Sequence, residues 1–325
     1  MDNTILLTTI SIVAILVILY LLITKLKTSK QKQELQSSIK QSKNTSTFSS
    51  TPSTKPTGSG KYIGQYKVIK VLGQGATSKV YLVEKDNKLY AAKLFQSEDP
   101  ELLERFKREV EILKQIKHVN IVQIFDYGEH EGKPYLILEY VEGKTLDEVY
   151  HDLTLIQKID VILAISNALN YLHNKGIIHR DIKPENILVH TNIKNSKLTD
   201  LGISRIVYWK PITYAGQILG TPSYMAPELF EGVYTDPKID IYSLGITMYE
   251  IFTGKLPFEG NASEVIIKHM KETPTLPTLI NPQIPTQLEK IIMKCIEKKP
   301  ERRYKSVSKL IEDLIFVKES LKNKE

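Results

Sequence analysis

The order of hydrophobic patterns along the chain constrains its fold more than any other feature. From Tyr62 onward, three short runs rich in β-branched and aromatic residues are broken by Gly73, Gly75, Asp86 and Asn87, which predicts antiparallel strands. One run with helical spacing and two more strand-like runs follow, and the remainder is mostly helical. The pattern predicts an α+β chain, with a small β-rich lobe before a larger helical lobe. The expected strands are residues 66–72, 79–84, 89–94, 121–127 and 135–140, and the expected helices are residues 101–116, 156–174, 239–253, 262–271, 287–298 and 307–322.

The N-terminal segment predicts a membrane anchor. Residues 5–23 contain no charged side chain, and a helix of that length, at about 1.5 Å per residue, spans a hydrocarbon layer of about 30 Å. Lysines follow within residues 25–32, and positive charge stays on the cytoplasmic side. A cleaved signal peptide is the alternative, but Asp2 precedes the run, the run is long, and no Ala-x-Ala site follows. We therefore expect a single-pass anchor over residues 1–27, with the rest of the chain in the cytoplasm.

Residues 28–61 are rich in serine, threonine, lysine and glutamine and almost free of apolar side chains. This composition predicts a disordered basic linker. Of the chain's net charge of +7, the share of residues 1–61 is +6, from eight lysines and two acidic residues. The basic excess therefore favours contact with anionic lipid headgroups, and we expect no nucleic-acid partner. The single cysteine, Cys295, excludes an intramolecular disulfide and a cysteine-based zinc site.

A glycine-rich turn is the first candidate for chemistry. Gly73 and Gly75 lie between two expected strands, where glycine lets a hairpin backbone approach phosphate groups closely. A Gly-x-Gly pair alone is more often a plain turn. A dinucleotide-binding fold would need a helix directly after the glycines, and a P-loop would need Gly-Lys-Ser/Thr, which is absent.

Lys93 ends an otherwise apolar run, and a lysine in such a strand is as often exposed at an edge. Glu109 changes this interpretation, because on the expected helix it shares the apolar face of Phe106, Val110 and Leu113. A carboxylate that points inward is unfavourable unless a cation meets it. We therefore expect Lys93 to pair with Glu109 and to keep ammonium hydrogens for phosphate oxygens.

A compact polar loop, residues 179–186, precedes another apolar run. It brings together the carboxylate of Asp181, the ammonium of Lys183 and the amide of Asn186, and Asp200 follows 14 residues later. Carboxylate and amide oxygens suit hard divalent cations. A charged surface loop is the plainer interpretation, but the apolar run that follows favours a rigid platform.

These motifs resemble, in type, order and spacing, those of a eukaryotic-type (Hanks-type) protein kinase domain. The resemblance covers residues 62–320, about four-fifths of the chain. It implies a bilobal fold, with an N-lobe over residues 62–140 and a C-lobe over residues 141–320. It also implies transfer of the γ-phosphoryl group of ATP to serine or threonine hydroxyls of protein substrates. The abundance of Ile, Lys and Asn suggests a bacterial source.

The resemblance assigns a role to each matching position. Asp181 would accept the proton of the substrate hydroxyl, Lys183 would steady the transferred group, and Lys93 would hold phosphates and pair with Glu109. Leu138 would guard the back of the nucleotide pocket. The implied ligands of Mg²⁺, for which Mn²⁺ could substitute, are Asn186 and Asp200, and the implied ATP contacts are Leu72, Gly73, Gly75, Val80, Ala91, Lys93, Glu139, Val141 and Leu188.

The resemblance extends beyond the nucleotide site. Residues 220–228 resemble the end of an activation segment, which docks a protein substrate. Glu228 should form a structural ion pair with Arg303. Residues 240–245 resemble the helix that anchors the catalytic loop.

Two threonines carry the expected specificity and regulation. Lys183 with Thr221 is the pattern of serine/threonine rather than tyrosine kinases. Arg180 beside Asp181 suggests control by loop phosphorylation, since a phosphate would neutralise the arginine. Thr213 is the first candidate acceptor, ahead of Tyr214, and Thr221 is expected to be structural.

Two departures from the family pattern leave the catalytic groups intact. Ser78 replaces the third glycine, and Leu201 replaces the usual phenylalanine after Asp200. The main alternative is an inactive kinase-like scaffold that binds partners at the membrane. A small-molecule kinase of related fold is a second alternative, which residues 220–228 argue against. Since only about four residues precede the apolar run, a signal would arrive through the linker, a partner, or helix pairing in a homodimer.

Overall fold

The computed structural model describes residues 61–75, 78–96, 100–201 and 222–323. The chain divides into two units, Met1–Thr57 and Gly58–Glu325, and all described residues belong to the second. The predicted anchor and nearly all of the predicted linker lie outside the described residues. Within the described residues, no helix combines the length and apolarity needed to cross a membrane.

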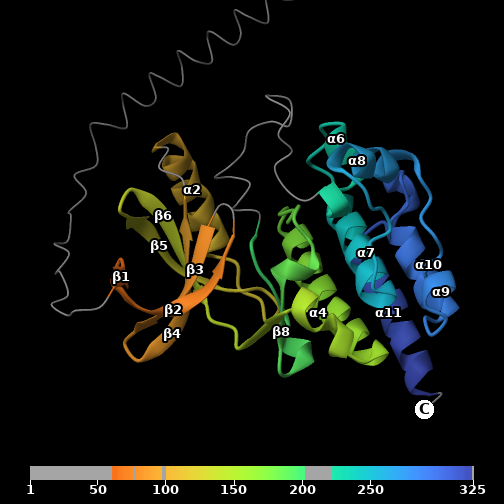
Figure 1. The fold of residues 1–325 in the computed structure, drawn as a ribbon, viewed down its shortest axis with the longest axis horizontal. Helices are drawn as coiled ribbons and strands as arrows, with labels where there is room; N and C mark the ends of the chain where they lie inside the picture. Colours follow the sequence, from red (N-terminus) through yellow and green to blue (C-terminus); the bar gives the residue numbers. More distant parts are fainter. Residues whose placement is uncertain (1–60, 76–77, 97–99, 202–221, 324–325) are drawn as a thin grey trace, which may run out of the picture. The chain divides into compact units, whose positions relative to one another are not determined.

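The β-rich lobe is a six-stranded sheet in the order β1-β2-β3-β4-β6-β5, with every neighbouring pair antiparallel (Figure 1). Asp86 and Asn87 form the two-residue turn between β3 and β4 with φ of 52° and 59°, the left-handed conformation that such hairpins favour. All five predicted strands are present, whereas the two-residue β1 was not predicted. The strands are β1 (Tyr62–Ile63), β2 (Tyr66–Gln74), β3 (Ser78–Lys85), β4 (Lys88–Phe95), β5 (Ile124–His130) and β6 (Lys133–Glu139).

The sheet buries apolar side chains on both faces. Along β6, Leu136 and Leu138 belong to the main core, while Tyr135 and Ile137 belong to a smaller cluster, as the two-residue period of a strand requires. Helix α2 (Pro100–Leu113) contributes to the main core, and its buried Phe106 packs edge-on against Phe95 of β4 at 5.4 Å between ring centroids. The smaller cluster, which includes three tyrosines, packs on the other face.

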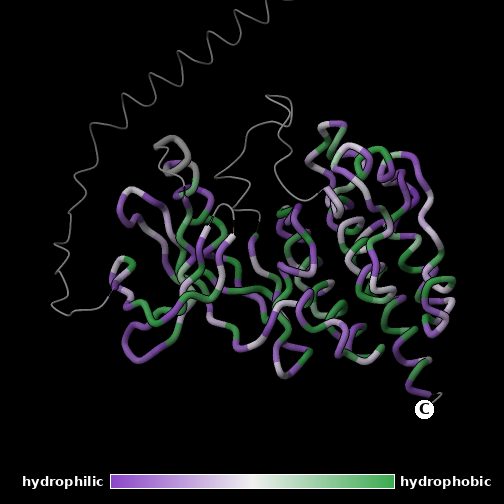
Figure 2. The backbone as a smooth tube through the Cα atoms, in the orientation of Figure 1, coloured by the Kyte–Doolittle hydropathy of each residue, from purple (hydrophilic) through white to green (hydrophobic). Residues whose placement is uncertain are grey.

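The helical lobe is built around α7 (Lys238–Thr253), whose residues are nearly all buried. In Figure 2 hydrophobic and hydrophilic residues alternate along its helices, as expected where one face of a helix is buried and the other meets water. Helix α4 (Leu155–Asn174) begins with a capping box between Thr154 and Gln157, which satisfies backbone N–H groups at the helix start. The remaining helices are α3 (Leu146–Val149), α6 (Pro227–Phe230), α8 (Ala262–Lys271), α9 (Pro277–Ile280), α10 (Thr286–Cys295) and α11 (Val307–Lys322).

A small antiparallel sheet lies where the two lobes meet. Asn195 and Ser196 are a hairpin signal in the sequence and lie in the turn between its last two strands, whereas its first strand was not predicted. Its strands are β7 (Gly143–Thr145), β8 (Ile187–His190) and β9 (Lys197–Leu198), in that order. Gly143 passes so close to β8 that a Cβ atom there would lie 2.2 Å from the carbonyl oxygen of Val189. This sheet positions the polar loop before β8 and the carboxylate after β9.

Candidate active site

A cleft of about 330 Å³ lies between the six-stranded sheet and the small sheet. Gly75 is not among the residues that line it; its N–H donates to the carbonyl of Ser78 at 2.9 Å and closes the hairpin turn. The other predicted ATP contacts do line it, together with Asp200. They are Leu72, Gly73, Val80, Ala91, Lys93, Glu139, Val141 and Leu188.

The cleft has two apolar walls that face each other across the lobes. Ala91 lies on β4, opposite Leu138 of β6 in the ladder, and Leu188 lies on β8, opposite Thr145 of β7. Behind Leu138, a narrower cavity is lined by Leu136 and Leu201 among others. A slot with apolar walls and polar backbone at its edge suits a flat aromatic ring.

The loop before β8 fixes its own carboxylate. The side-chain nitrogen of Asn186, Nδ2, donates to the backbone carbonyl oxygen of Asp181 at 2.8 Å and to its carboxylate Oδ2 at 2.9 Å. The carbonyl of Asn186 accepts from the N–H of Thr199 at 3.0 Å, which places the loop beside the residue before Asp200. The side-chain carbonyl of Asn186 is thereby left for another ligand.

Asp240 of α7 anchors the same loop from below. Its fully buried carboxylate accepts the backbone N–H groups of His179 at 2.9 Å and Arg180 at 2.7 Å, and its Oδ2 lies 2.7 Å from Nε2 of His173. Burial alone would raise the pKa of Asp240, but these donors outweigh it and hold the pKa below its ordinary value. Arg180 has φ of 66°, a conformation that non-glycine residues keep only when neighbours impose it.

Asp200 faces the cleft with its charge preserved. Its Oδ1 lies 2.5 Å from Nζ of Lys93, and the side chains are 25% and 8% exposed. Burial acts to raise the pKa of Asp200, but Lys93 most strongly, then His179 and Lys183, hold it below the ordinary value. The ammonium groups of Lys93 and Lys183 therefore both act on one carboxylate.

The predicted Lys93–Glu109 pair is not formed, which corrects the sequence-based expectation. Glu109 is exposed, while Phe106 and Val110 on the same helix are fully buried. At 100° per residue, Glu109 lies at the edge of this apolar stripe rather than at its centre. Water therefore solvates its carboxylate at no desolvation cost, and Lys93 takes the nearer partner, Asp200.

Residues 66–315 match a family model described as the protein kinase domain. The chain belongs to the protein kinase family. A probable serine/threonine-protein kinase of Clostridium acetobutylicum is 37% identical over 268 residues, 80% of this chain and 41% of the relative. The serine/threonine-protein kinase PrkC of Bacillus subtilis is 35% identical over 266 residues, 78% and 41% of the two chains. The chain thus spans about two fifths of the length of these curated relatives.

The kinase fold is also evident from a solved structure. Rad53 residues 1–466 in complex with AMP-PNP match this chain with a TM-score of 0.65 and 26% identity, over 76% of this chain and 64% of that one. The bilobal arrangement expected from the sequence is therefore confirmed.

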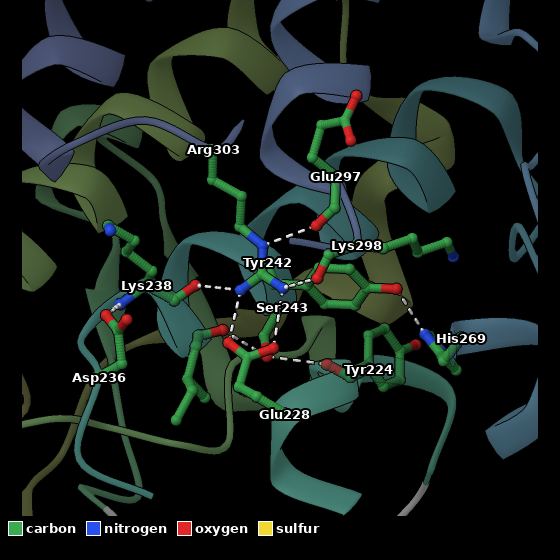
Figure 3. A network of polar contacts seen from close by, with 11 residues as sticks. Tyr224, Glu228, Asp236, Lys238, Tyr242, Ser243, His269, Glu297, Lys298 and Arg303 are labelled. Atoms are coloured by element: carbon green, nitrogen blue, oxygen red, sulfur yellow. Dashed lines mark hydrogen bonds and ion pairs between the residues drawn. The ribbon is translucent and has the colours of Figure 1, made fainter. Parts of the chain in front are cut away.

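The predicted ion pair between Glu228 and Arg303 is formed (Figure 3). The two guanidinium nitrogens donate to the two carboxylate oxygens at 2.6 and 2.8 Å. The remaining N–H groups reach the carbonyls of Glu297, Lys238 and Lys298, so all five donors are used. The guanidinium also lies over the ring of Tyr242, 4.7 Å from its centre. This network fixes the end of the segment that leads from the cleft to α7.

His179 has a structural role in the site that the sequence did not reveal. Its ring is fully buried, Nε2 lies 2.9 Å from the carbonyl of Thr199, and Nδ1 accepts the N–H of Asp181 at 3.3 Å. It therefore joins the loop of Asp181 to the strand that leads to Asp200. Only its place two residues before Asp181 could have suggested this bridge.

Three sequence-based expectations concern the activation segment. Thr213, Tyr214 and Thr221 lie outside the described residues.

The two residues that depart from the family pattern are both described. Leu201, which precedes the activation segment, is buried and lines the narrow cavity behind Leu138. Ser78, at the position of the missing glycine, begins β3 and pairs with Phe95 of β4.

Proposed function

We propose that this chain is a serine/threonine protein kinase that transfers the γ-phosphoryl group of ATP to hydroxyl groups of proteins. The observation that carries the proposal is the arrangement of Lys93, Asp200 and the Asn186–Asp181 hydrogen bonds around one apolar-walled cleft. The names of the curated relatives support serine/threonine specificity. The complex of Rad53 with AMP-PNP supports ATP as the nucleotide.

In this proposal Asp181 receives the proton of the attacking hydroxyl. One of its oxygens is occupied by the Asn186 amide, so the other is available to the substrate. A bond forms between the hydroxyl oxygen and the γ-phosphorus while the bond to the β-phosphate oxygen breaks, and ADP leaves. Lys183, whose charge acts on Asp200, is the group proposed to steady the transferred phosphoryl. When ATP binds, the ammonium group of Lys93 would leave Asp200 and contact the phosphates instead.

The two proposed metal ligands fit a divalent cation. Asn186 commits its amide nitrogen to Asp181, which leaves its carbonyl oxygen, and Asp200 stays charged. Among the described residues there is no group of three or more acidic, histidine or cysteine side chains that could form a complete cage. Mg²⁺, or Mn²⁺ in its place, suits such a site because it accepts few protein oxygens together with water and phosphates. When bound, the cation neutralises charge on the β- and γ-phosphates.

Incubation with γ-labelled ATP and Mg²⁺ tests the activity. We expect the full-length chain to label itself or a generic protein substrate, and acid hydrolysis to release phosphoserine or phosphothreonine. Asp181→Asn should lower the rate of labelling by about 10²–10⁴. Absence of label on protein, with label on a small molecule or nowhere, would instead favour the small-molecule kinase or the inactive scaffold.

The proposed location is a membrane, with the kinase domain in the cytoplasm. The support is the uncharged run of residues 5–23 and the lysines that follow it. We expect the full-length chain to sediment with membranes and to need detergent for extraction, and deletion of residues 1–27 to release an active protein. A full-length chain in the soluble fraction would contradict the anchor. Pairing of two anchors in a homodimer belongs to the same proposal.

The proposed regulation is autophosphorylation of the activation segment. Arg180 supports it, because its backbone is fixed by Asp240 while its Nε donates to the carbonyl of Tyr234 at 3.1 Å, a neutral partner that a phosphate could replace. Mass spectrometry of the autophosphorylated chain should identify Thr213 first. A Thr213→Ala variant that keeps full activity and the same phosphate content would contradict this choice.

A further inference from the structure

Lys197, the first residue of β9, lies behind the nucleotide cleft and connects two other segments to its strand. Its Nζ lies 3.2 Å from Oε1 of Glu139 and donates to the carbonyl of Val119 at 2.7 Å. The Lys197 side chain is 13% exposed and that of Glu139 is 30% exposed. Both residues line a second cavity of about 340 Å³, which shares residues 139–141 with the nucleotide cleft.

Glu139 extends this connection to helix α2. Its Oε2 accepts the N–H of Gln123 at 3.2 Å, while its own N–H donates to the carbonyl of Gln123 at 2.8 Å. The side-chain amide of Gln123 donates to the carbonyl of Lys114 at 3.2 Å, just beyond the end of α2. Three side chains thus connect α2, the segment between the lobes and β9.

The strand that carries Lys197 pairs with the strand that forms the floor of the cleft. Lys197 lies opposite Leu188 in the ladder between β8 and β9, and Leu188 is one apolar wall of the cleft. The next residue, Leu198, is hydrogen-bonded to the carbonyl of Asn120 and to the N–H of Val122, both at 2.9 Å. Asp200 follows two residues later. Lys197 therefore lies where the floor, the wall at Glu139 and the strand to Asp200 meet.

We propose that Lys197, through its ion pair with Glu139, is a positioning residue for the nucleotide. The pair holds the backbone of residues 139–141 at a fixed distance from Leu188, so that the two sides of the slot stay in register for a flat base. Removing one partner leaves a partly buried charge without its counterion, and the freed segment must rearrange to solvate it. The inference rests on the proposed function, because it assumes that the cleft binds ATP.

A second ion pair in the chain provides a matched control. Lys318 of α11 pairs with Asp160 of α4, and these side chains are 16% and 18% exposed, close to the burial of the Lys197 pair. It joins two helices of the helical lobe, and neither residue lines the cleft. Loss of either pair should therefore affect folding stability similarly, whereas only the Lys197 pair should affect nucleotide binding.

The test compares full-length wild type with Lys197→Met, Glu139→Gln, Lys197→Arg and Lys318→Met. AMP-PNP affinity with Mg²⁺ is measured by titration calorimetry, and KM for ATP and kcat are measured with a generic protein substrate. For Lys197→Met and Glu139→Gln we expect affinity to fall and KM to rise about fivefold, the upper effect of a partly exposed pair. For Lys197→Met, which changes no cleft-lining residue, kcat should be nearly unchanged. Lys197→Arg should keep wild-type affinity, and a double variant with Lys197→Met and Glu139→Gln together should bind no more weakly than Lys197→Met alone.

Three results would overturn the inference. Wild-type affinity in Lys197→Met would show that the pair is only structural. An equal loss of affinity in Lys318→Met would show that general destabilisation is the cause. If wild type does not bind AMP-PNP at all, the proposed function fails together with the inference, and this outcome is distinguishable from the other two. Should Lys197→Met fail to fold, Glu139→Gln gives the same comparison.

Discussion

At the scale of residues, the two ends of the site are held in unfavourable backbone conformations. Arg180 and Asp200 have φ of 66° and 62°, which costs about 1–3 kcal/mol each for non-glycine residues. Buried polar contacts offset this: Asp240 binds the backbone of the loop, and Lys93 binds the side chain of Asp200. A reacting hydroxyl and the phosphates can be held in position only by carboxylates that are themselves fixed.

The Asp240 anchor makes stability depend on acidity. Because its pKa is lower in the folded state, its contribution is complete above about pH 4, the ordinary range of an aspartate, and is lost as the pH falls through the folded-state value. Asp240→Asn should lower the melting temperature at pH 7. On acidification from pH 7 to pH 3, its melting temperature should fall by less than that of wild type. Asp86→Asn, on the exposed β3–β4 turn, should behave as wild type. Equal acid sensitivity in wild type and Asp240→Asn would contradict the assignment.

The buried Glu228–Arg303 pair should be costly to break. Arg303→Met leaves the Glu228 carboxylate and three carbonyls without their donors, and loss of one partner of such a pair costs about 3–5 kcal/mol. Urea unfolding of the full-length chain measures the change. Lys309→Met, which breaks the exposed pair with Glu312, is the control and should leave the midpoint unchanged. A midpoint for Arg303→Met that equals the control would contradict the structural role of the network.

At the scale of elements, α7 organises the helical lobe because other elements pack on all its sides. It carries Asp240 toward the catalytic loop, and its Ser243 hydroxyl donates to the carbonyl of Tyr224 at 2.8 Å. At Gly245 it approaches α10 so closely that a Cβ atom would lie 2.6 Å from Cβ of Cys295 and 2.7 Å from Cγ2 of Ile296. Neither neighbour is flexible there, so the absence of a side chain sets the distance between the helices.

Gly245→Ala tests this contact. Alanine favours a helix over glycine by about 1 kcal/mol, but overpacking a buried contact costs about 1–3 kcal/mol. We expect a net loss of stability by thermal melting, and a larger loss for Gly245→Val. Lys290→Ala, on the exposed side of α10, should change little. A melting temperature that rises in Gly245→Ala would show that the helices can separate without cost.

At the scale of the whole molecule, the sequence predicted the order of elements and most of the cleft. Periodicity identified the strands and long helices, because local side-chain pattern determines both. It could not determine the Glu109 orientation, since that residue lies at the edge of the stripe and Lys93 had two acidic partners to choose from. Nor could it predict β7, because a strand of three residues carries no measurable period; for β8 and β9 the turn residues Asn195 and Ser196 gave the one local signal. Long-range contacts such as Lys197 with Glu139 leave no local trace at all.

The central claim is that one set of groups in the cleft binds ATP and another set transfers its phosphoryl group. AMP-PNP affinity and phosphoryl transfer, both measured on full-length Asp181→Asn, test this most directly. The account predicts affinity within twofold of wild type and transfer lower by about 10²–10⁴, the range expected for loss of a catalytic base. Transfer that persists at the wild-type rate, or affinity that falls together with the rate, would contradict the account.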